Sequence, residues 1–211
     1  VYNDGNVADS FLLRGRAGNG AWGVKYVDRS TGMDITTDVT GAGWVTPSLA
    51  KGRYCWVRVD VGPAAGVPAG TAFPLLLTAT SVGDAAKQDA VKAETTCALT
   101  RRPDAVIHNG SAYLGDGTYN TSGTGQTHSR TVSSGTAATY LIRLYNDGNA
   151  VDGLVVNAQG DSALWGVKYF DHSTGADITA GVAGAGWVTS SLRSGAYASV
   201  RAEVTPSVRV A

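Results

Sequence analysis

The residues whose spacing most suggests chemistry are two pairs of aspartates. Asp28 and Asp34 flank a Ser-Thr-Gly turn, and Asp171 and Asp177 flank a second one. Paired carboxylates are the acid and base of glycoside hydrolases when a cleft holds them at a fixed separation. Aspartates that bind the backbone of their own turn explain the same residues without catalysis. We favour a copied turn over a copied active site, and we predict no catalytic residues and no enzymatic activity.

Candidate oxygen ligands for calcium also occur in two matching sets. These are Asp4, Asn6 and Asp9, and then Asp147, Asn149 and Asp152. Their spacing differs from the calcium loop of helix–loop–helix proteins. We therefore expect hydrogen bonds within turns and no cofactor, with calcium as the alternative. The three histidines are scattered and two cysteines cannot complete a structural zinc site, so no metal site is predicted.

The two cysteines, Cys55 and Cys97, both fall on the apolar side of alternating patterns. An inward position for each makes a disulfide between two sheets a candidate, and a secreted protein would permit its oxidation. The alternative is a pair of buried free thiols. Ala198 occupies the position that matches Cys55, so the fold does not require a bridge there.

Aromatic residues provide the candidates for surface contact. Trp22 and Trp44 recur as Trp165 and Trp187, which favours packing within the protein. Trp56 has no such equivalent, because the matching position of the second copy is Ser199, and alternation places Trp56 on the outward side of its strand. We predict surface contacts at Trp56, Tyr113 and Tyr119. A coplanar strip of exposed tryptophans would instead indicate carbohydrate binding.

Two kinds of covalent modification are further alternatives. Lys25 and Lys168 could form isopeptide links, although alternation places both on the solvent side of their strands. Asn109 and Asn120 begin N-glycosylation acceptor patterns, whose use depends on the source of the protein.

These residues sit in a chain that repeats itself. The sequence from Val1 onward returns from Leu144 at one constant offset, so that Val1 matches Leu144 and Pro63 matches Pro206. Of the 68 compared positions, 34 are identical, and the match has no gap. Such similarity indicates a tandem duplication, and repetition at a fixed period decides the interpretation of the fold.

Each copy reads as a series of short strands separated by Gly, Asn and Asp turns. Strict alternation at residues 198–204 predicts a strand with one buried and one wet face. Further strands are expected at 140–145, 154–157 and 165–170, and in the first copy at 53–61, 71–80 and 89–97. The fold class is therefore all-β, with tandem immunoglobulin-like β-sandwiches, both incomplete in this chain.

The expected domain organisation has three parts. Residues 1–97 form a sandwich that lacks its first strands, residues 98–125 an ordered connector, and residues 126–211 a sandwich that lacks its last strands. Exchange of strands between separate chains would fill only one sandwich per chain. We therefore expect a window cut from a longer array of repeats.

Composition limits the partners. The 17 basic and 17 acidic residues among 211 cancel, which argues against nucleic acid or an anionic membrane as a partner. No apolar run approaches the roughly 20 residues of a membrane helix. The many glycines and few charges are typical of secreted β proteins.

The patterns Tyr-Asn-Asp-Gly-Asn, Trp-Gly-Val-Lys-Tyr and Gly-Ala-Gly-Trp-Val-Thr resemble the immunoglobulin-like repeats of bacterial surface and secreted proteins of the CARDB and NEW3 kind. The resemblance covers the sandwiches and implies a non-catalytic spacer, an adhesin stalk or a module attached to an extracellular enzyme. We expect an extracellular, cell-surface filament or stalk whose partners are copies of itself or neighbouring repeats. The alternative is a carbohydrate- or surface-binding accessory module.

Overall fold

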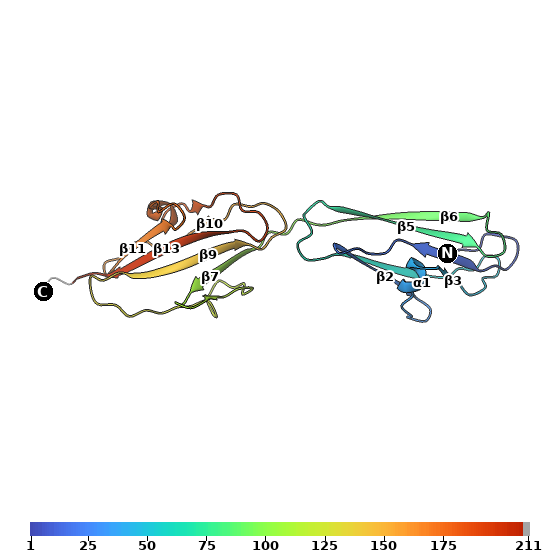
Figure 1. Cartoon of the computed structure of the whole chain (residues 1–211), viewed down its shortest axis with the longest axis horizontal. Coiled ribbons are helices and arrows are strands. Elements are labelled where there is room, and N and C mark those ends of the chain that lie inside the picture. Colours follow the sequence, from blue (N-terminus) through green and yellow to red (C-terminus); the bar gives the residue numbers. More distant parts are fainter. Residues whose placement is uncertain (209–211) are drawn as a thin grey trace. The chain divides into compact units, whose positions relative to one another are not determined.

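The computed structural model describes residues 1–208 and divides into two compact units, Val1–Ala98 and Leu99–Ala211. Regular structure is almost entirely β, and every strand pair is antiparallel (Figure 1). The prediction of an all-β protein is confirmed. Each unit is described by itself below.

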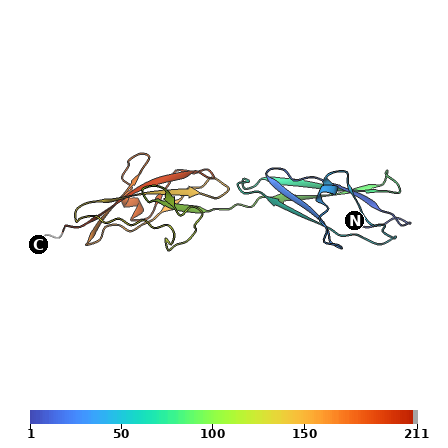
Figure 2. The ribbon, with the colours of Figure 1, turned by 60° about the horizontal axis from the view of Figure 1, so that its bottom comes forward.

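Unit 1 contains two antiparallel sheets that face one another (Figures 1 and 2). Its elements are β1 (Phe11–Gly15), β2 (Trp22–Asp28), α1 (Thr36–Thr40), β3 (Trp44–Val45), β4 (Val57–Pro63), β5 (Ala72–Ser81) and β6 (Gln88–Thr96). One sheet has the order β3-β1-β5-β6, and the other is the pair β2-β4. Tyr26 of β2 and Phe73 of β5 are almost fully buried in one apolar cluster, which joins the two sheets.

Unit 2 also contains two antiparallel sheets, but here the sheet that corresponds to β2-β4 is the larger one. Its elements are β7 (Pro103–His108), β8 (Tyr113–Leu114), β9 (Ala138–Asn146), β10 (Val155–Val156), β11 (Trp165–Asp171), α2 (Thr179–Val182), β12 (Trp187–Val188) and β13 (Tyr197–Pro206). The larger sheet has the order β11-β13-β9-β7-β8, and β10-β12 form the smaller one. Val200, Ala202 and Val182 belong to the buried cluster of this unit.

The repeat in the sequence is a repeat in the structure. At the offset that matches Val1 with Leu144, the elements β1, β2, α1, β3 and β4 correspond to β10, β11, α2, β12 and β13. Local hydrogen bonds are copied as well, since the Thr36 hydroxyl accepts from the Tyr26 N–H at 2.9 Å and the Thr179 hydroxyl accepts from the Tyr169 N–H at 2.9 Å. The same side chains therefore build the same loops twice.

A buried asparagine explains why the Tyr-Asn-Asp-Gly-Asn pattern occurs in both copies. The Asn3 amide donates to the carbonyls of Val7 and Leu49 at 2.9 and 2.7 Å, and its oxygen accepts from the Gly5 N–H. Asn146 makes the same three bonds in unit 2, with Ala150, Leu192 and Gly148. Both side chains are 1% exposed, so this amide ties three backbone groups together inside each unit.

The two units carry complementary parts of one topology. Unit 1 contains β5 and β6, and β5 pairs with β1; unit 2 has no counterpart to them among the described residues. Unit 2 contains β7, β8 and the part of β9 from Ala138 to Arg143, which extend the sheet beside β13. Within the described residues, unit 1 lacks their counterparts beside β4.

The segment 98–125, which we expected to be a connector, is almost wholly part of unit 2. The unit boundary falls between Ala98 and Leu99, and β7 pairs with β9 from Pro103↔Asn146 to Ile107↔Ile142. The basic residues and Pro103 resemble a linker in sequence, yet proline is tolerated as the first residue of a strand. Alternate residues Asp104 and Val106 are buried, which is the pattern of a paired strand.

Candidate interaction site

The aspartate pairs form closed turns. Asp28 is buried and accepts from the Ser30 N–H at 2.9 Å, the Ser30 hydroxyl at 2.7 Å and the Thr31 hydroxyl at 2.8 Å. These bonds, those of Ser30 above all, hold the pKa of Asp28 below its usual value. Asp171 is held by Ser173 in the same way. A carboxylate saturated by its own turn explains why both copies have the same spacing.

The second aspartate of each pair also serves its turn. Asp34 accepts from the Thr36 N–H at 3.0 Å and forms an ion pair with Lys25 at 3.3 Å. Asp177 accepts from the Thr179 N–H at 2.9 Å. Lys25 is half exposed in that ion pair, which matches the solvent-facing position expected for it.

Two of the calcium candidates, Asp9 and Asp152, bind residues that lie far away in the sequence. Asp9 accepts from the Ser81 hydroxyl and from the Gly83 N–H, and Asp152 pairs with Arg101. In the part of the chain that the structure describes, no three His, Cys, Asp or Glu side chains converge as metal ligands would.

The predicted disulfide is not formed, and both cysteines are buried thiols. Cys55 precedes β4 near Asp28. Cys97 follows β6, whose Thr95 pairs with Phe73, the residue that stacks on Trp22, and its thiol donates to the Val67 carbonyl at 3.4 Å. Asp28 and Trp22 lie at opposite ends of the β2-β4 pair, and a strand of that length spans about 20 Å. Alternation gives the face of each cysteine correctly but not its position along the strand, and a disulfide needs Cα atoms within about 7 Å.

The tryptophans do not form a flat strip. Trp22 is buried and stacks on Phe73 at 5.4 Å between ring centroids, whereas Trp56 is 65% exposed. Trp56 meets Tyr54 edge to face, with an interplanar angle of 77°. Trp165, which corresponds to Trp22, is 45% exposed. Among the described residues, no aromatic ring stacks on Trp165 as Phe73 of β5 stacks on Trp22.

Tyr113 and Tyr119 bind within unit 2. The Arg143 guanidinium lies 4.1 Å from the Tyr113 ring centroid and 4.4 Å from that of Tyr197. The Tyr119 hydroxyl donates to Asp147 at 2.7 Å, and this bond raises the pKa of Tyr119. Tyr113 and Tyr119 therefore make contacts within unit 2, whereas Trp56 belongs to unit 1.

One buried carboxyl in unit 2 was not singled out from the sequence. Asp104 is 2% exposed, and one of its oxygens accepts from the Gly117 N–H at 2.9 Å, while the other has no partner among the described residues. Burial raises the pKa of Asp104, and the nearby Asp147 and Asp116 raise it further. Asp104 lies in β7, within the segment that we predicted to be a connector, so its burial was not predicted.

The most prominent open feature lies in unit 1, along β4. One edge of β4 pairs with β2 over its whole length, and the other edge pairs only just before the strand, where Cys55 and Val1 exchange two hydrogen bonds of 2.9 Å. Three exposed aromatic residues, Tyr2, Tyr54 and Trp56, surround this start. Among the described residues no strand covers the remainder of the edge.

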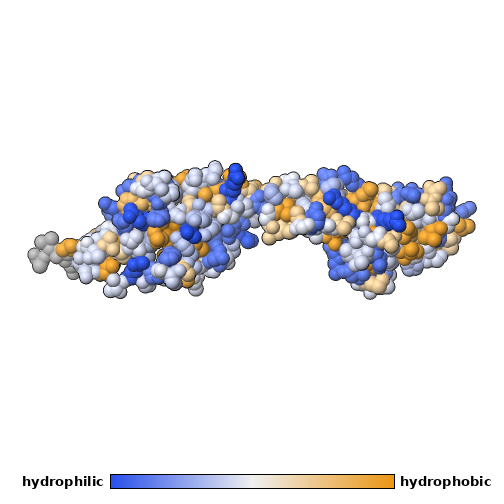
Figure 3. Space-filling view, viewed as in Figure 1, coloured by the Kyte–Doolittle hydropathy of each residue, from blue (hydrophilic) through white to orange (hydrophobic). Residues whose placement is uncertain are grey.

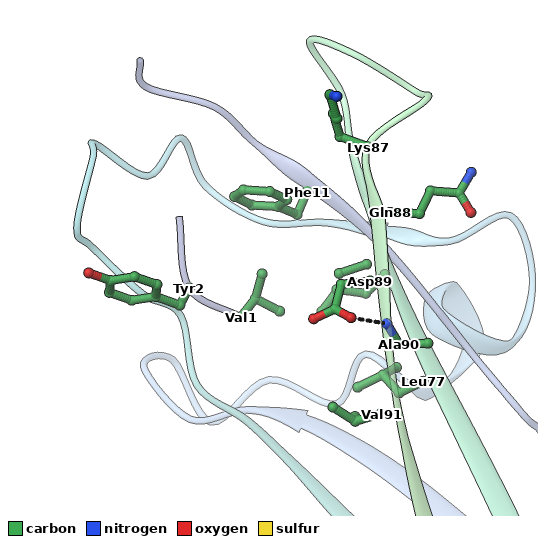
Figure 4. Close-up of a pocket in the computed structure, with 11 residues that line it drawn as sticks. Val1, Tyr2, Phe11, Leu77, Lys87, Gln88, Asp89, Ala90 and Val91 are labelled. Atoms are coloured by element: carbon green, nitrogen blue, oxygen red, sulfur yellow. Dashed lines mark hydrogen bonds between the residues drawn. The ribbon is translucent and has the colours of Figure 1, made fainter. Parts of the chain in front are cut away.

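An apolar groove follows this open edge, and we call it the edge groove. Val59 and Val61 of β4 line one side, and Leu75, Leu77, Val91 and Ala93 of β5 and β6 line the other. Leu77 and Val91 also line a cavity of about 310 Å³ beside Val1. Figure 4 shows Val1 facing the β6 residues Asp89 to Val91, while the Tyr2 ring points away. Apolar surface is visible on unit 1 in Figure 3.

The residues of the edge groove are apolar but incompletely covered. Val91 pairs with Leu77 and Ala93 with Leu75, so all four lie on the core side of their sheet. Leu75 is 3% exposed, yet Val91 is 62% exposed. In unit 2, β9 and β7 extend the sheet that corresponds to β2-β4. The layer that would cover Val91 is thus the one that unit 1 lacks among its described residues.

Comparisons with protein families, curated proteins and solved structures found no match for this chain. Among residues 1–208, no helix is long and apolar enough to cross a membrane.

Proposed function

We propose that this chain is a segment of a tandem array of immunoglobulin-like β-sandwiches that forms the body of an extracellular stalk or filament and carries out no catalysis. The observation that carries the proposal is the complementarity of the two units. Unit 1 contains β5 and β6, which have no counterpart among the described residues of unit 2. Unit 2 contains β7, β8 and the first part of β9, which have no counterpart among the described residues of unit 1.

The repeated unit, which has the length of the stretch from Val1 to Arg143, can serve as the building block of such an array. An array of similar repeats gains length by addition, and its stability is approximately the sum of repeat and interface contributions. The best-defined polar groups of the chain, such as Asn3 and Asp28, are bound to their own loops. They support the fold of each repeat and do not converge as groups that bind a substrate would.

The experiment is to label intact cells of the source with an antibody raised against this chain, and to image the native protein by negative stain. We expect labelled fibres or stalks at the cell surface, with a regular repeat along them. Labelling only after lysis, or compact isolated particles, would contradict the proposal.

The second candidate function is binding to a carbohydrate or another surface, and the exposed aromatic group of Tyr2, Tyr54 and Trp56 favours it. The steeply inclined rings of Tyr54 and Trp56 do not offer a flat platform for sugar stacking. Titration of the chain with soluble glycans, followed by tryptophan fluorescence, tests this candidate. Binding that Trp56→Ala abolishes and that Tyr119→Ala leaves unchanged would support it over the array.

A further inference from the structure

The open edge of β4 can be compared, residue by residue, with the same strand in unit 2. The counterpart β13 pairs with β11 on one side and with β9 on the other, from Tyr197↔Tyr145 to Val204↔Ala138. Val200 and Ala202 of β13 are buried, whereas their counterparts Val57 and Val59 in β4 remain partly exposed. Along this edge the two copies differ in that β13 has β9 as its neighbour, whereas β4 has no such neighbour among the described residues.

The last residues of that neighbour are already in place in unit 1. Val1 and Tyr2 correspond to Leu144 and Tyr145, in the last part of β9. Val1 pairs with Cys55 as Leu144 pairs with Ala198, and Tyr2 bridges Tyr54 as Tyr145 pairs with Tyr197. The pairs that Val1 and Tyr2 form just before β4 therefore fix the register of any strand that continues along the rest of β4.

We infer that the open edge of β4 and the edge groove are the seat of a second copy of the β9 sequence Ala138–Arg143, entering directly before Val1 on the same chain. The offset between the two copies assigns the register. Ala138 would lie opposite Val61, Tyr140 opposite Val59, and Ile142 opposite Val57. The inference rests on the proposed array, because it takes the occupant from a neighbouring repeat.

The side chains of this segment match the edge groove. In unit 2, Tyr140, Ile142 and Leu144 pack against the buried cluster. On unit 1 the same alternation would direct Tyr140 and Ile142 toward Leu77 and Val91. A one-residue shift would turn these apolar side chains to the other face, so the match depends on register.

The opposite face of the added strand would also meet a matching surface on unit 1. In unit 2, Arg143 pairs with Ser199 and its guanidinium lies over the Tyr197 ring at 4.4 Å. The counterparts in unit 1 are Trp56 and Tyr54, both exposed and in edge contact with each other. A guanidinium opposite Trp56 would gain cation–π contacts there. This assigns a partner to the exposed aromatic pair.

The test places residues 136–143 of this chain directly before Val1 of the full chain and measures hydrogen exchange of the β4 amides by mass spectrometry. We expect exchange in β4 to slow at least tenfold relative to the unmodified chain, because edge amides become hydrogen-bonded. The matched control omits Arg143 from the added segment. It keeps the composition almost unchanged but shifts the register by one residue.

Three outcomes would overturn the inference. The first is equal exchange with the in-register and the shifted segments. The second is protection by a free peptide of residues 136–143 without protection by the attached one. The third is protection of β4 in the unmodified chain that rises with protein concentration, which would assign the edge to another molecule. None of these measurements depends on fibres or cell location, so the proposed function can fail separately.

Discussion

At the scale of single residues, each of the two buried asparagines, Asn3 and Asn146, binds three backbone groups of its unit. Asn146 satisfies two carbonyls and one N–H that lie inside unit 2. A buried polar group left without its partner costs about 1–3 kcal/mol. The exposed Asn120 makes comparable bonds within its own loop, which provides a matched comparison.

We therefore predict that Asn146→Ala lowers the free energy of unfolding of unit 2 by about 3 kcal/mol, and that Asn120→Ala lowers it by less than about 1 kcal/mol. Urea unfolding followed by hydrogen exchange of peptides from unit 2 measures both. Similar losses for the two variants would contradict the assignment of Asn146 as the buried tie.

Asp104 leads to a prediction about pH. Its folded-state pKa is raised, first by burial, so the stability that its protonated form provides is fully present below the unfolded pKa of about 3.9. That stability is lost as the pH rises through the folded pKa. Above the folded pKa the wild-type unit holds an unfavourable buried charge.

Asp104→Asn removes that charge and retains an oxygen for the Gly117 N–H. We expect the variant to be more stable than the wild type at pH 7, by about 1 kcal/mol, with the advantage shrinking below pH 4. Asp116→Asn, at an exposed neighbouring position, should change little. An advantage of Asp104→Asn that does not vary with pH would show that the charge is not its cause.

At the scale of elements, β5 explains why matched tryptophans differ between the copies. Phe73 of β5 stacks on Trp22, and both are buried, whereas Trp165 has no such neighbour among the described residues and is 45% exposed. Removing the Phe73 ring should leave Trp22 in a setting more like that of Trp165.

We predict that Phe73→Ala destabilises unit 1 by about 3–5 kcal/mol and increases the access of acrylamide to Trp22. Leu76→Ala, at a position of β5 that is 51% exposed, should cost less than about 1 kcal/mol. Thermal unfolding and fluorescence quenching measure these effects. An unchanged Trp22 in Phe73→Ala would contradict the importance of the stacked pair.

Periodicity in the sequence located most of the strands. The expected strands at 165–170, 71–80 and 89–97 correspond to β11, β5 and β6 within one or two positions. The short helices α1 and α2 were not predicted, because five and four residues are too few for helical periodicity to appear. β7 was missed because its polar and proline-containing start resembles a linker.

The site was harder to predict than the strands. The repeat indicated that unit 1 lacks its first strand, but the edge groove depends on which core-side residues of β5 and β6 remain uncovered. Trp56 was placed correctly on the outside, whereas the neighbouring exposure of Tyr2 and Tyr54 follows from the open edge of the sheet. The disulfide prediction was wrong because inward-facing residues can still lie at opposite ends of a strand pair.

At the scale of the whole molecule, the central claim is that the stretch from Val1 to Arg143 is one repeat length and that each unit holds a different part of the repeat. Unit 2 should then accept a copy of residues 69–98 after Ala211, since β10 would pair with the copied β5 as β1 pairs with β5 in unit 1. The added copy of Phe73 would reach Trp165 as Phe73 reaches Trp22.

The most direct measurement is the solvent exposure of Trp165 in the full chain with residues 69–98 added after Ala211. It can be followed by ¹⁹F NMR of fluorotryptophan-labelled protein, with the signal assigned by Trp165→Phe. We predict that Trp165 becomes as protected as Trp22, and that Phe73→Ala in the added copy abolishes the protection. A Trp165 that stays as accessible as in the unmodified chain would contradict the claim.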